Sequence, residues 1–342
     1  LLVPYSDDGQ YTISNGNRLS GTPIAQWIYA FEVNETNLNP ATAVTYIGQN
    51  QNFTPAKVTS GVANYGSWED FLKKISYRVV VKDGVEQYRV QYDDPTKKLD
   101  GSPAILTGAD GDLFTKFVHI WRKYTKTTKG YKIELSDKPF TGAKSLTNEL
   151  ENGYNQFNNP IMIMLQDLYL LIFKDRDSQT ALGRGYVDGN SVYANTGGTN
   201  SKGYIYGETT GKLQMCFLGI EDLWGNKLQW VDGLVSDANW DLLLGDKAFN
   251  DAGSGYTKQT TNITANTGGY FTKVQGGNAG YILANKDGSE TTGYADYGYL
   301  YSGRVAYFGG NQGYGSIAGA FNCRMTYSAS SAYAYISARL CF

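Results

Sequence analysis

The C-terminal segment, residues 302–342, reads SGRVAYFGGNQGYGSIAGAFNCRMTYSASSAYAYISARLCF, and its pattern decides the fold class that we expect. Between 332 and 340, small or apolar residues alternate with polar or aromatic ones. Such a period of two is typical of a strand with one face on a core and the other in solvent. The inward set is Ala332, Ala334, Ile336, Ala338 and Leu340. The outward set is Tyr333, Tyr335, Ser337 and Arg339.

The same segment has the composition of a binding surface. Its glycines give the backbone freedom that exposed loops need. Tyrosine supplies a large amphipathic contact area with only two torsions to fix, and Ser, Asn and Arg add adaptable hydrogen bonds. An ordinary Tyr-rich sheet edge explains the pattern equally well, so both interpretations stay open at this point. The candidate contact residues between the glycines are Tyr314, Ile317, Asn322, Arg324, Thr326 and Tyr327.

The composition indicates a β protein with many loops. Charged residues make up 18% of the 342 residues, whereas Gly and Tyr occur 41 and 28 times. The formal net charge is −2, and no segment forms the basic stripe that phosphate binding requires, so we expect no nucleic-acid partner. The first residue is not Met, and no secretory signal follows it, so we expect a trimmed N-terminus.

The longest apolar run, residues 161–173, is too short to span a bilayer, and we expect no membrane insertion. The three cysteines, Cys216, Cys323 and Cys341, lack C-x-x-C spacing. This spacing predicts neither a zinc site nor a disulfide framework, and cytoplasmic synthesis without disulfides fits it best.

Two segments are expected along the chain: a small β-rich N-terminal domain, residues 1–103, and a second domain, residues 104–342. In the first, residues 26–33 read as a strand, and Asp83-Gly84 joins a hairpin of 77–82 with 85–92. Ser67 is expected to cap a short helix over 68–75.

In the second domain, a strand that alternates around His119 is expected to form a hairpin with residues 131–135. Asn159 followed by Pro160 predicts the start of a helix that is apolar nearly all round over 161–174, and therefore buried.

Chemical motifs are weak. His119 is the only histidine, which removes most catalytic triads and histidine metal sites. Carboxylate pairs such as Asp175 and Asp177 could serve a glycosidase only at a suitable separation. The string GIEDLWGN, residues 219–226, favours a structural corner in which Trp packs and carboxylates cap backbone amides. We therefore expect no catalytic residue, no metal site and no cofactor.

Several strings together resemble a known family. They are DSQTALGRGYVDGN (177–190), NTGGTNSKG (195–203), GIEDLWGN, WVDG (230–233) and the terminal GGN…AGAF…SAS…ISARL frame. The chain resembles the phage-tail and prokaryotic variable proteins that retroelements diversify. The resemblance covers about residues 100–342, and more loosely NYGSWED at 64–70. It implies an α+β fold of the C-type lectin-like, formylglycine-generating-enzyme-like type, preceded by the additional small N-terminal β-rich domain.

The resemblance further implies non-catalytic recognition through a variable region at 303–342. Adenine-directed exchange in such proteins acts on Asn codons; Tyr314 fits that rule, whereas Gln312 does not. The implied ligand-binding residues are Asn311, Gln312, Tyr314, Ile317, Asn322, Cys323, Arg324, Thr326, Tyr327, Ser331, Tyr333 and Tyr335.

The implied partner is a receptor, protein or glycan, on a host or neighbouring cell. The implied location is an exposed phage tail or a prokaryotic cell surface, with a homotrimer or another homo-oligomer as the family's habit. Two enzymatic alternatives stay open. One is a copper oxidase of the formylglycine-generating type with Cys323 and Cys341 as ligands, and the other is a tail-associated polysaccharide hydrolase.

Overall fold

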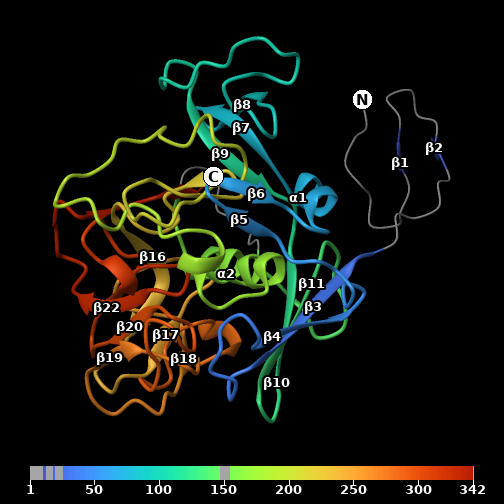
Figure 1. Ribbon diagram of the computed structural model, residues 1–342. Helices are drawn as coiled ribbons and strands as arrows, with labels where there is room; N and C mark the ends of the chain where they lie inside the picture. Colours follow the sequence, from blue (N-terminus) through green and yellow to red (C-terminus); the bar gives the residue numbers. More distant parts are fainter. Residues whose placement is uncertain (1–10, 13–17, 20–25, 147–154, 342) are drawn as a thin grey trace.

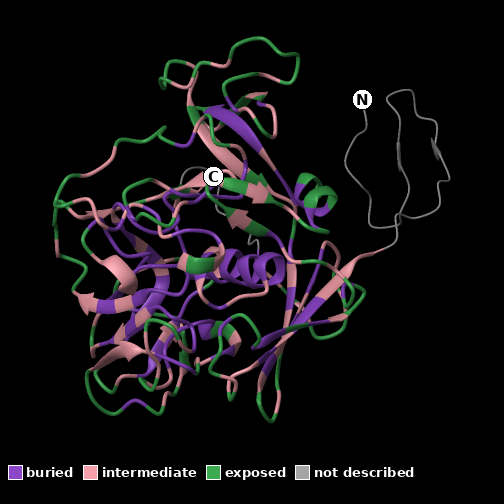
Figure 2. Ribbon diagram, in the orientation of Figure 1, coloured by how far each residue is buried: buried purple, intermediate pink, exposed green. Residues whose placement is uncertain are grey.

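A buried helix, α2 (Asn159–Phe173), lies between two sheets in the computed structural model, which describes residues 11–12, 18–19, 26–146 and 155–341 (Figure 1). Asn158 caps the helix by accepting a hydrogen bond from the Ile161 amide, and Pro160 occupies its first turn. Lys174 ends it in the left-handed conformation. The helix is buried on almost every side, as Figure 2 shows. The prediction of a buried helix is confirmed, although the capping residue is Asn158 rather than Asn159.

On one side of α2 lies a five-stranded antiparallel sheet in the order β12-β10-β11-β3-β4. Tyr46 on β4 donates a hydrogen bond to the Leu171 carbonyl of α2 at 2.6 Å, which fastens the sheet to the helix. The strands are β3 (Ile28–Asn34), β4 (Val44–Gly48), β10 (Trp121–Lys126), β11 (Gly130–Ser136) and β12 (Lys144–Ser145).

A three-stranded sheet, β8-β7-β9, contains the hairpin expected at Asp83-Gly84. Both turn residues have positive φ, 51° and 76°, as a type I′ turn requires. The hairpin prediction is therefore confirmed. The strands are β7 (Ser76–Lys82), β8 (Val85–Arg89) and β9 (Asp112–Phe117).

Strand pairing crosses the predicted boundary at residue 103 twice. β9 pairs with β7, and β11 pairs with β3. The same hydrophobic core contains Trp68 and Tyr46 from the first segment and the buried face of α2 from the second. The N-terminal strands thus share sheets and a core with the rest of the chain.

An eight-stranded sheet lies on the other side of α2. Its order is β18-β17-β16-β21-β22-β20-β19, and β23 pairs with β16. The strands are β16 (Leu228–Ser236), β17 (Leu242–Leu244), β18 (Thr257–Gln259), β19 (Thr267–Tyr270), β20 (Tyr297–Leu300), β21 (Val305–Phe308), β22 (Cys323–Tyr327) and β23 (Ile336–Ser337).

The remaining elements are short. They are β1 (Tyr11–Thr12), β2 (Arg18–Leu19), β5 (Lys57–Thr59), β6 (Val62–Asn64), β13 (Asn155–Gln156), β14 (Cys216–Phe217), β15 (Ile220–Glu221), β24 (Leu340–Cys341), α1 (Glu69–Ile75), α3 (Ser178–Ala181) and the 3-10 turns η1 (Gly277–Ala279) and η2 (Gly315–Ile317). The described chain is mostly β with few helices, which agrees with the β-rich class expected from the composition.

Three local predictions need correction. Ser67 does not cap α1, because its hydroxyl accepts a hydrogen bond from the Thr54 amide instead, and Trp68 takes the capping position without a side-chain bond. The expected strand around His119 is divided: β9 ends at Phe117 in one sheet, and β10 begins at Trp121 in another.

The terminal alternation is also corrected. Ala332, Ala334, Ala338 and Leu340 are exposed, and the segment pairs only in the two-residue strands β23 and β24. The segment is held instead by Arg339, which donates to the side-chain oxygen of Gln229 at 2.6 Å and to the Glu221 carbonyl at 2.6 Å. Alanine buries too little apolar area to fix a strand, whereas these charge-assisted bonds do so.

Candidate binding surface

Five adjacent strands of the eight-stranded sheet place a row of side chains on one face. Reading across the register, Trp230 of β16 lies opposite Tyr307 of β21, Tyr307 opposite Arg324 of β22, and Arg324 opposite Tyr299 of β20. Gly268 of β19 lies opposite Tyr299 at the end of the row. Residues that pair directly across strands project from the same side of a sheet. Arg324 is therefore the centre of an aromatic row.

Gly268 makes room for this row. A Cβ atom at that position would lie 2.1 Å from the Cδ2 atom of the Tyr299 ring, closer than two carbon atoms can approach. The ring of Tyr299 thus lies over the glycine backbone. The absence of a side chain at residue 268 sets where this end of the row can lie.

A second group of tyrosines continues the row toward the C-terminus. The Tyr327 ring stacks on Tyr307 with centroids 5.1 Å apart and approaches Tyr333 at 5.0 Å. Tyr333 and Tyr335 stack nearly parallel, at 4.9 Å and 6°. The hydroxyls of Tyr327 and Tyr335 form a hydrogen bond of 3.0 Å. Tyr327 thus connects the other two rings to the fully buried Tyr307, and Tyr333 keeps 47% of its surface exposed.

Arg324 lies within a set of tyrosine rings. Its Cζ atom is 5.1 Å from the ring centroid of Tyr314, 5.6 Å from that of Tyr297 and 5.8 Å from that of Tyr299. These distances lie within the range of cation–π attraction. A cation held by ring faces retains its charge toward solvent.

Burial raises the pKa of three tyrosine hydroxyls in this region, so these three stay protonated at neutral pH. Burial raises the pKa of Tyr314, and the positive charge of Arg324 only partly offsets it. Burial likewise raises the pKa of Tyr307, which shares a 2.5 Å hydrogen bond with the Thr326 hydroxyl. For Tyr335, desolvation and the hydrogen bond to Tyr327 both raise the pKa. The surface therefore offers neutral hydroxyl groups and one fixed cation.

We call this surface the aromatic face. It comprises Trp230, Tyr297, Tyr299, Tyr314, Arg324, Thr326, Tyr327, Tyr333 and Tyr335, together with the fully buried Tyr307, whose ring supports Trp230 and Tyr327. Six of the predicted contact residues meet here: Tyr314, Arg324, Thr326, Tyr327, Tyr333 and Tyr335. Sequence reasoning missed Trp230, Tyr297, Tyr299 and Tyr307. The period of two in YGYLY, residues 297–301, could have indicated that Tyr297 and Tyr299 share a face.

Four predicted contact residues lie inside the molecule and are corrected to scaffold residues. Asn322 is fully buried and donates to the carbonyls of Tyr297 and Ile317. Cys323 faces the core, and burial raises the pKa of its thiol to about 12. Asn311 and Gln312 are 7% and 6% exposed.

The side chains of Asn311 and Gln312 both accept hydrogen bonds from backbone amides. Asn311 accepts from Gly313, and Gln312 accepts from Ser191 at 2.9 Å. Ile317 and Ser331 are half-buried at positions between the scaffold and solvent. Ile317 ends the turn η2, and the Ser331 hydroxyl lies 3.2 Å from that of Ser328.

The string 219–226 forms the corner that its composition predicts. Trp224 is fully buried and donates from its indole nitrogen to the Gly183 carbonyl at 3.1 Å. The Glu221 carboxylate accepts from the amides of Gly197 and Thr199 at 2.7 and 2.6 Å. The carboxylate thus closes a backbone loop, as expected.

Carboxylates at the other candidate positions also have structural partners. Asp175 accepts from the Asp177 amide at 2.8 Å, and Asp177 caps α3 by accepting from the Thr180 amide.

Burial raises the pKa of the Cys341 thiol to about 11, so this sulfur, like that of Cys323, is protonated at neutral pH. Within the described ranges, no three His, Cys, Asp or Glu side chains are grouped to hold a metal ion.

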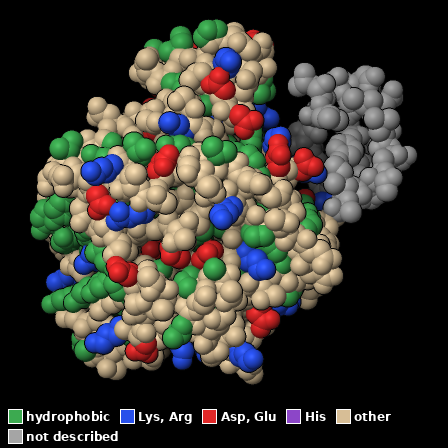
Figure 3. All heavy atoms as spheres, viewed as in Figure 1, with side chains coloured by type: hydrophobic (Ala, Val, Ile, Leu, Met, Phe, Trp, Pro, Cys, Tyr) green, Lys and Arg blue, Asp and Glu red, His purple; other side chains and the backbone are tan. Residues whose placement is uncertain are grey.

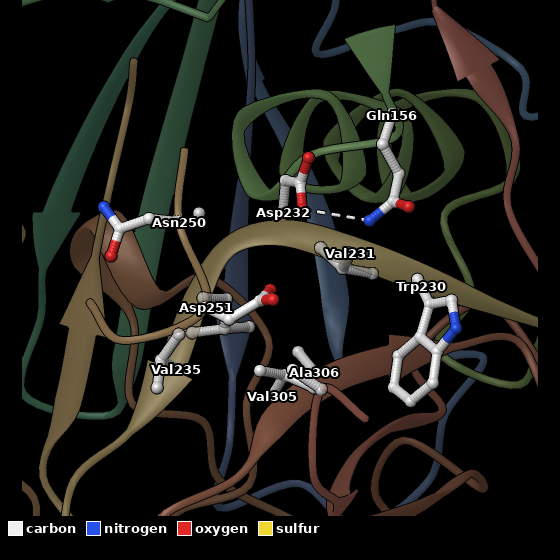
Figure 4. Close-up of a pocket in the computed structure, with 12 residues that line it drawn as sticks. Gln156, Trp230, Val231, Asp232, Val235, Asn250, Asp251, Val305 and Ala306 are labelled. Carbon is white, nitrogen blue, oxygen red and sulfur yellow. Dashed lines mark hydrogen bonds between the residues drawn. The ribbon is translucent and has the colours of Figure 1, made fainter. Parts of the chain in front are cut away.

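A small cavity of about 190 Å³ adjoins the aromatic face (Figure 4). Trp230 belongs to both, because its ring also packs edge-on against Tyr307 at 6.1 Å. Asp232 and Asp251 line the cavity, and Gln156 donates to Asp232 at 2.9 Å. Burial raises the pKa of Asp232, and the neighbouring Asp251 raises it further.

Comparison of the sequence with models of known protein families found no match, and comparison with curated proteins found none either. No helix in the described part of the chain is long and apolar enough to cross a membrane. The side of the molecule drawn in Figure 3 carries Lys and Arg interspersed with Asp and Glu, without a large area of one sign.

Proposed function

We propose that the chain is a non-catalytic binding protein that recognises a cell-surface receptor through the aromatic face. The observation that carries this proposal is the solvent-side cluster of Tyr327, Tyr333 and Tyr335, whose rings contact one another and connect to the buried Tyr307 through Tyr327. Clustered Tyr, Trp and Arg side chains are the types that contribute most to protein recognition. Tyr333 is 47% exposed, so burial gives this ring little structural role.

The scaffold proposed for this face is C-type lectin-like. In support, the 303–342 segment separates into two kinds of residue. Asn322, Cys323 and the backbone glycines near 309 are buried and hold strands and turns, whereas Arg324 and Thr326 alternate with the buried Cys323 and Met325 on β22, and the half-buried Tyr327 ends the strand. A strand with one fixed and one free face permits exchange of contact residues without loss of the fold. The proposed exchange by a retroelement would act on the outward set.

Display on a phage tail, with a prokaryotic cell surface as the alternative location, follows from the same proposal. One copy of the chain binds with the affinity of a single face. Several copies in a homo-oligomer would raise the avidity through effective concentration.

The proposal is tested with a multimerised form of the chain, added to a panel of bacterial cells and measured by flow cytometry. Tyr333→Ala and Tyr335→Ala should each reduce capture by at least about tenfold, the effect of removing a hot-spot residue. Tyr77→Ala is the control, because Tyr77 is a half-buried tyrosine on β7, which belongs to another sheet. Equal capture by all the variants would overturn the proposal.

Diversification has a separate genetic test. A near-copy of the codons for residues 303–342, differing only at adenines and lying beside a reverse transcriptase gene, should occur downstream. Without such a copy, the binding proposal would stand and the exchange mechanism would fall.

A further inference from the structure

Arg324 is a cation without a counterion. Within the part of the chain that the structure describes, no carboxylate lies within ion-pair distance of it. Its Nε atom is closed off from solvent and has no hydrogen-bond partner, and no acceptor among the described residues bonds to Nη1 or Nη2. A guanidinium has five N–H groups in a fixed planar fork, and all of them are unused here. The aromatic face therefore has unused hydrogen-bond donors at its centre.

The surroundings make this charge available to a ligand. Tyr297, Tyr299 and Tyr314 hold the guanidinium by their ring faces, which attract a cation but cannot neutralise it. A half-buried hydroxyl lies nearby on Thr326, two residues along β22, whereas Tyr307, one strand away, is fully buried and shares a hydrogen bond with that hydroxyl. A planar anion placed on the fork would receive two parallel N–H bonds and an additional O–H bond from Thr326.

The position of Arg324 favours a protein partner. β22 is the middle strand of the row β16-β21-β22-β20-β19, so aromatic side chains surround the cation on both sides. Strong contacts in protein interfaces are central and are surrounded by residues that exclude water. A carboxylate paired at such a centre is desolvated and worth more than one at the rim.

We infer that Arg324 is the specificity-determining residue of the aromatic face, and that it binds the Asp or Glu carboxylate of an acidic peptide segment on the partner. This inference rests on the proposed binding function and assigns the chemistry that the face selects. Trp230 and Tyr333 would contact apolar atoms on either side of the carboxylate. The partner segment should thus carry one acid between apolar or aromatic residues.

The first experiment selects peptides from a random 12-residue display library on the immobilised chain. Wild type should enrich sequences with Asp or Glu at one fixed position among apolar residues. Arg324→Gln should abolish the acid preference and reduce affinity for the enriched peptides by about 10- to 100-fold, the range for a charged hot-spot contact. Arg324→Lys should recover only part of it, because lysine keeps the charge but not the planar fork.

The outcomes of this selection separate the two proposals. Loss of all selected peptides in Tyr333→Ala, with retention in Tyr77→Ala, supports the face as the binding site. Enrichment by wild type without an acid preference overturns the role of Arg324 and leaves the binding function standing. No enrichment by wild type over Tyr333→Ala overturns peptide binding. Binding to polygalacturonate, in place of acidic peptides, overturns the choice of a protein partner.

A second experiment needs no partner. Benzoate and benzamide have the same shape, but only benzoate is an anion that can accept two bonds from a guanidinium. Titration followed by NMR should show benzoate binding at least about tenfold more tightly than benzamide, with shifts at the Arg324 side chain. This preference should disappear in Arg324→Gln. Equal binding of the two probes would overturn the inference even if the peptide selection succeeds.

Discussion

The buried ion pair between Arg122 and Asp167 should be essential to the scaffold below the aromatic face. Arg122 on β10 donates from Nε to the Asp167 carboxylate on α2 at 2.5 Å, and the two side chains are 7% and 0% exposed. Tyr281 donates to the other carboxylate oxygen at 2.6 Å, and Arg122 also donates to the Gly277 carbonyl at 2.9 Å. The pair thus connects the five-stranded sheet, the central helix and the loop at η1.

Removing the cation alone should be costly. Arg122→Met leaves the Asp167 carboxylate without its partner in a site with no solvent, and breaking a buried pair in this way costs about 3–5 kcal/mol of unfolding free energy. Arg122→Met combined with Asp167→Asn removes both charges but keeps an oxygen to accept from Tyr281. We expect this double variant to be more stable than Arg122→Met alone by at least about 2 kcal/mol, since the desolvated charge is gone.

The cost of Arg122→Met should also depend on pH. Burial raises the pKa of Asp167, and Arg122 lowers it, so the pKa rises further once Arg122 is lost. A carboxyl whose folded pKa exceeds its unfolded value favours folding at low pH, and that contribution disappears as the pH rises through the folded pKa. Urea unfolding followed by Trp fluorescence should therefore show a smaller cost at pH 5 than at pH 7. A cost below about 1 kcal/mol at pH 7, or strict additivity in the double variant, would refute this reasoning.

Three further predictions concern single positions. Burial raises the pKa of Asp222 to about 6, so the free energy of unfolding of the wild type should fall by up to about 3 kcal/mol between pH 4 and pH 7 because of this group. Asp222→Asn should reduce that fall, as measured by urea unfolding. An unchanged pH profile would contradict the raised pKa of Asp222. Gly268→Ala should displace the Tyr299 ring, because the new Cβ atom would lie 2.1 Å from the ring. This variant should weaken benzoate binding about two- to tenfold, with little change in melting temperature. Undiminished benzoate affinity would show that the Tyr299 ring does not position the Arg324 cation. Tyr335→Phe removes a half-exposed hydrogen bond to Tyr327 and should cost under about 1 kcal/mol of stability in thermal unfolding, whereas a larger loss would mean that this tyrosine belongs to the core.

Local sequence patterns predicted the elements that depend on neighbours in the chain. The apolar run at 161–173 gives helix α2 because it can be satisfied only inside a core. Asp83-Gly84 gives its hairpin because both residues accept positive φ. The predicted cap at Ser67 failed because a nonlocal amide, that of Thr54, takes the hydroxyl.

Local sequence patterns predicted only part of the candidate binding surface. The sequence by itself determined that the C-terminal segment is rich in tyrosine and that Tyr314, Arg324, Thr326 and Tyr327 are candidate contact residues within it. It could not show which side faces solvent, because a period of two divides a strand into two faces without naming the buried one.

Only the tertiary structure decided the rest of the aromatic face. β22 pairs in parallel with β20 on one side and antiparallel with β21 on the other, and β16 lies beyond β21. This order brings Tyr299 beside Arg324 and Trp230 into the same row beyond Tyr307, although Tyr299 lies 25 and Trp230 lies 94 positions earlier in the chain. The physical reason is that strand order follows from packing the whole sheet against α2, a property of distant contacts that no local pattern records.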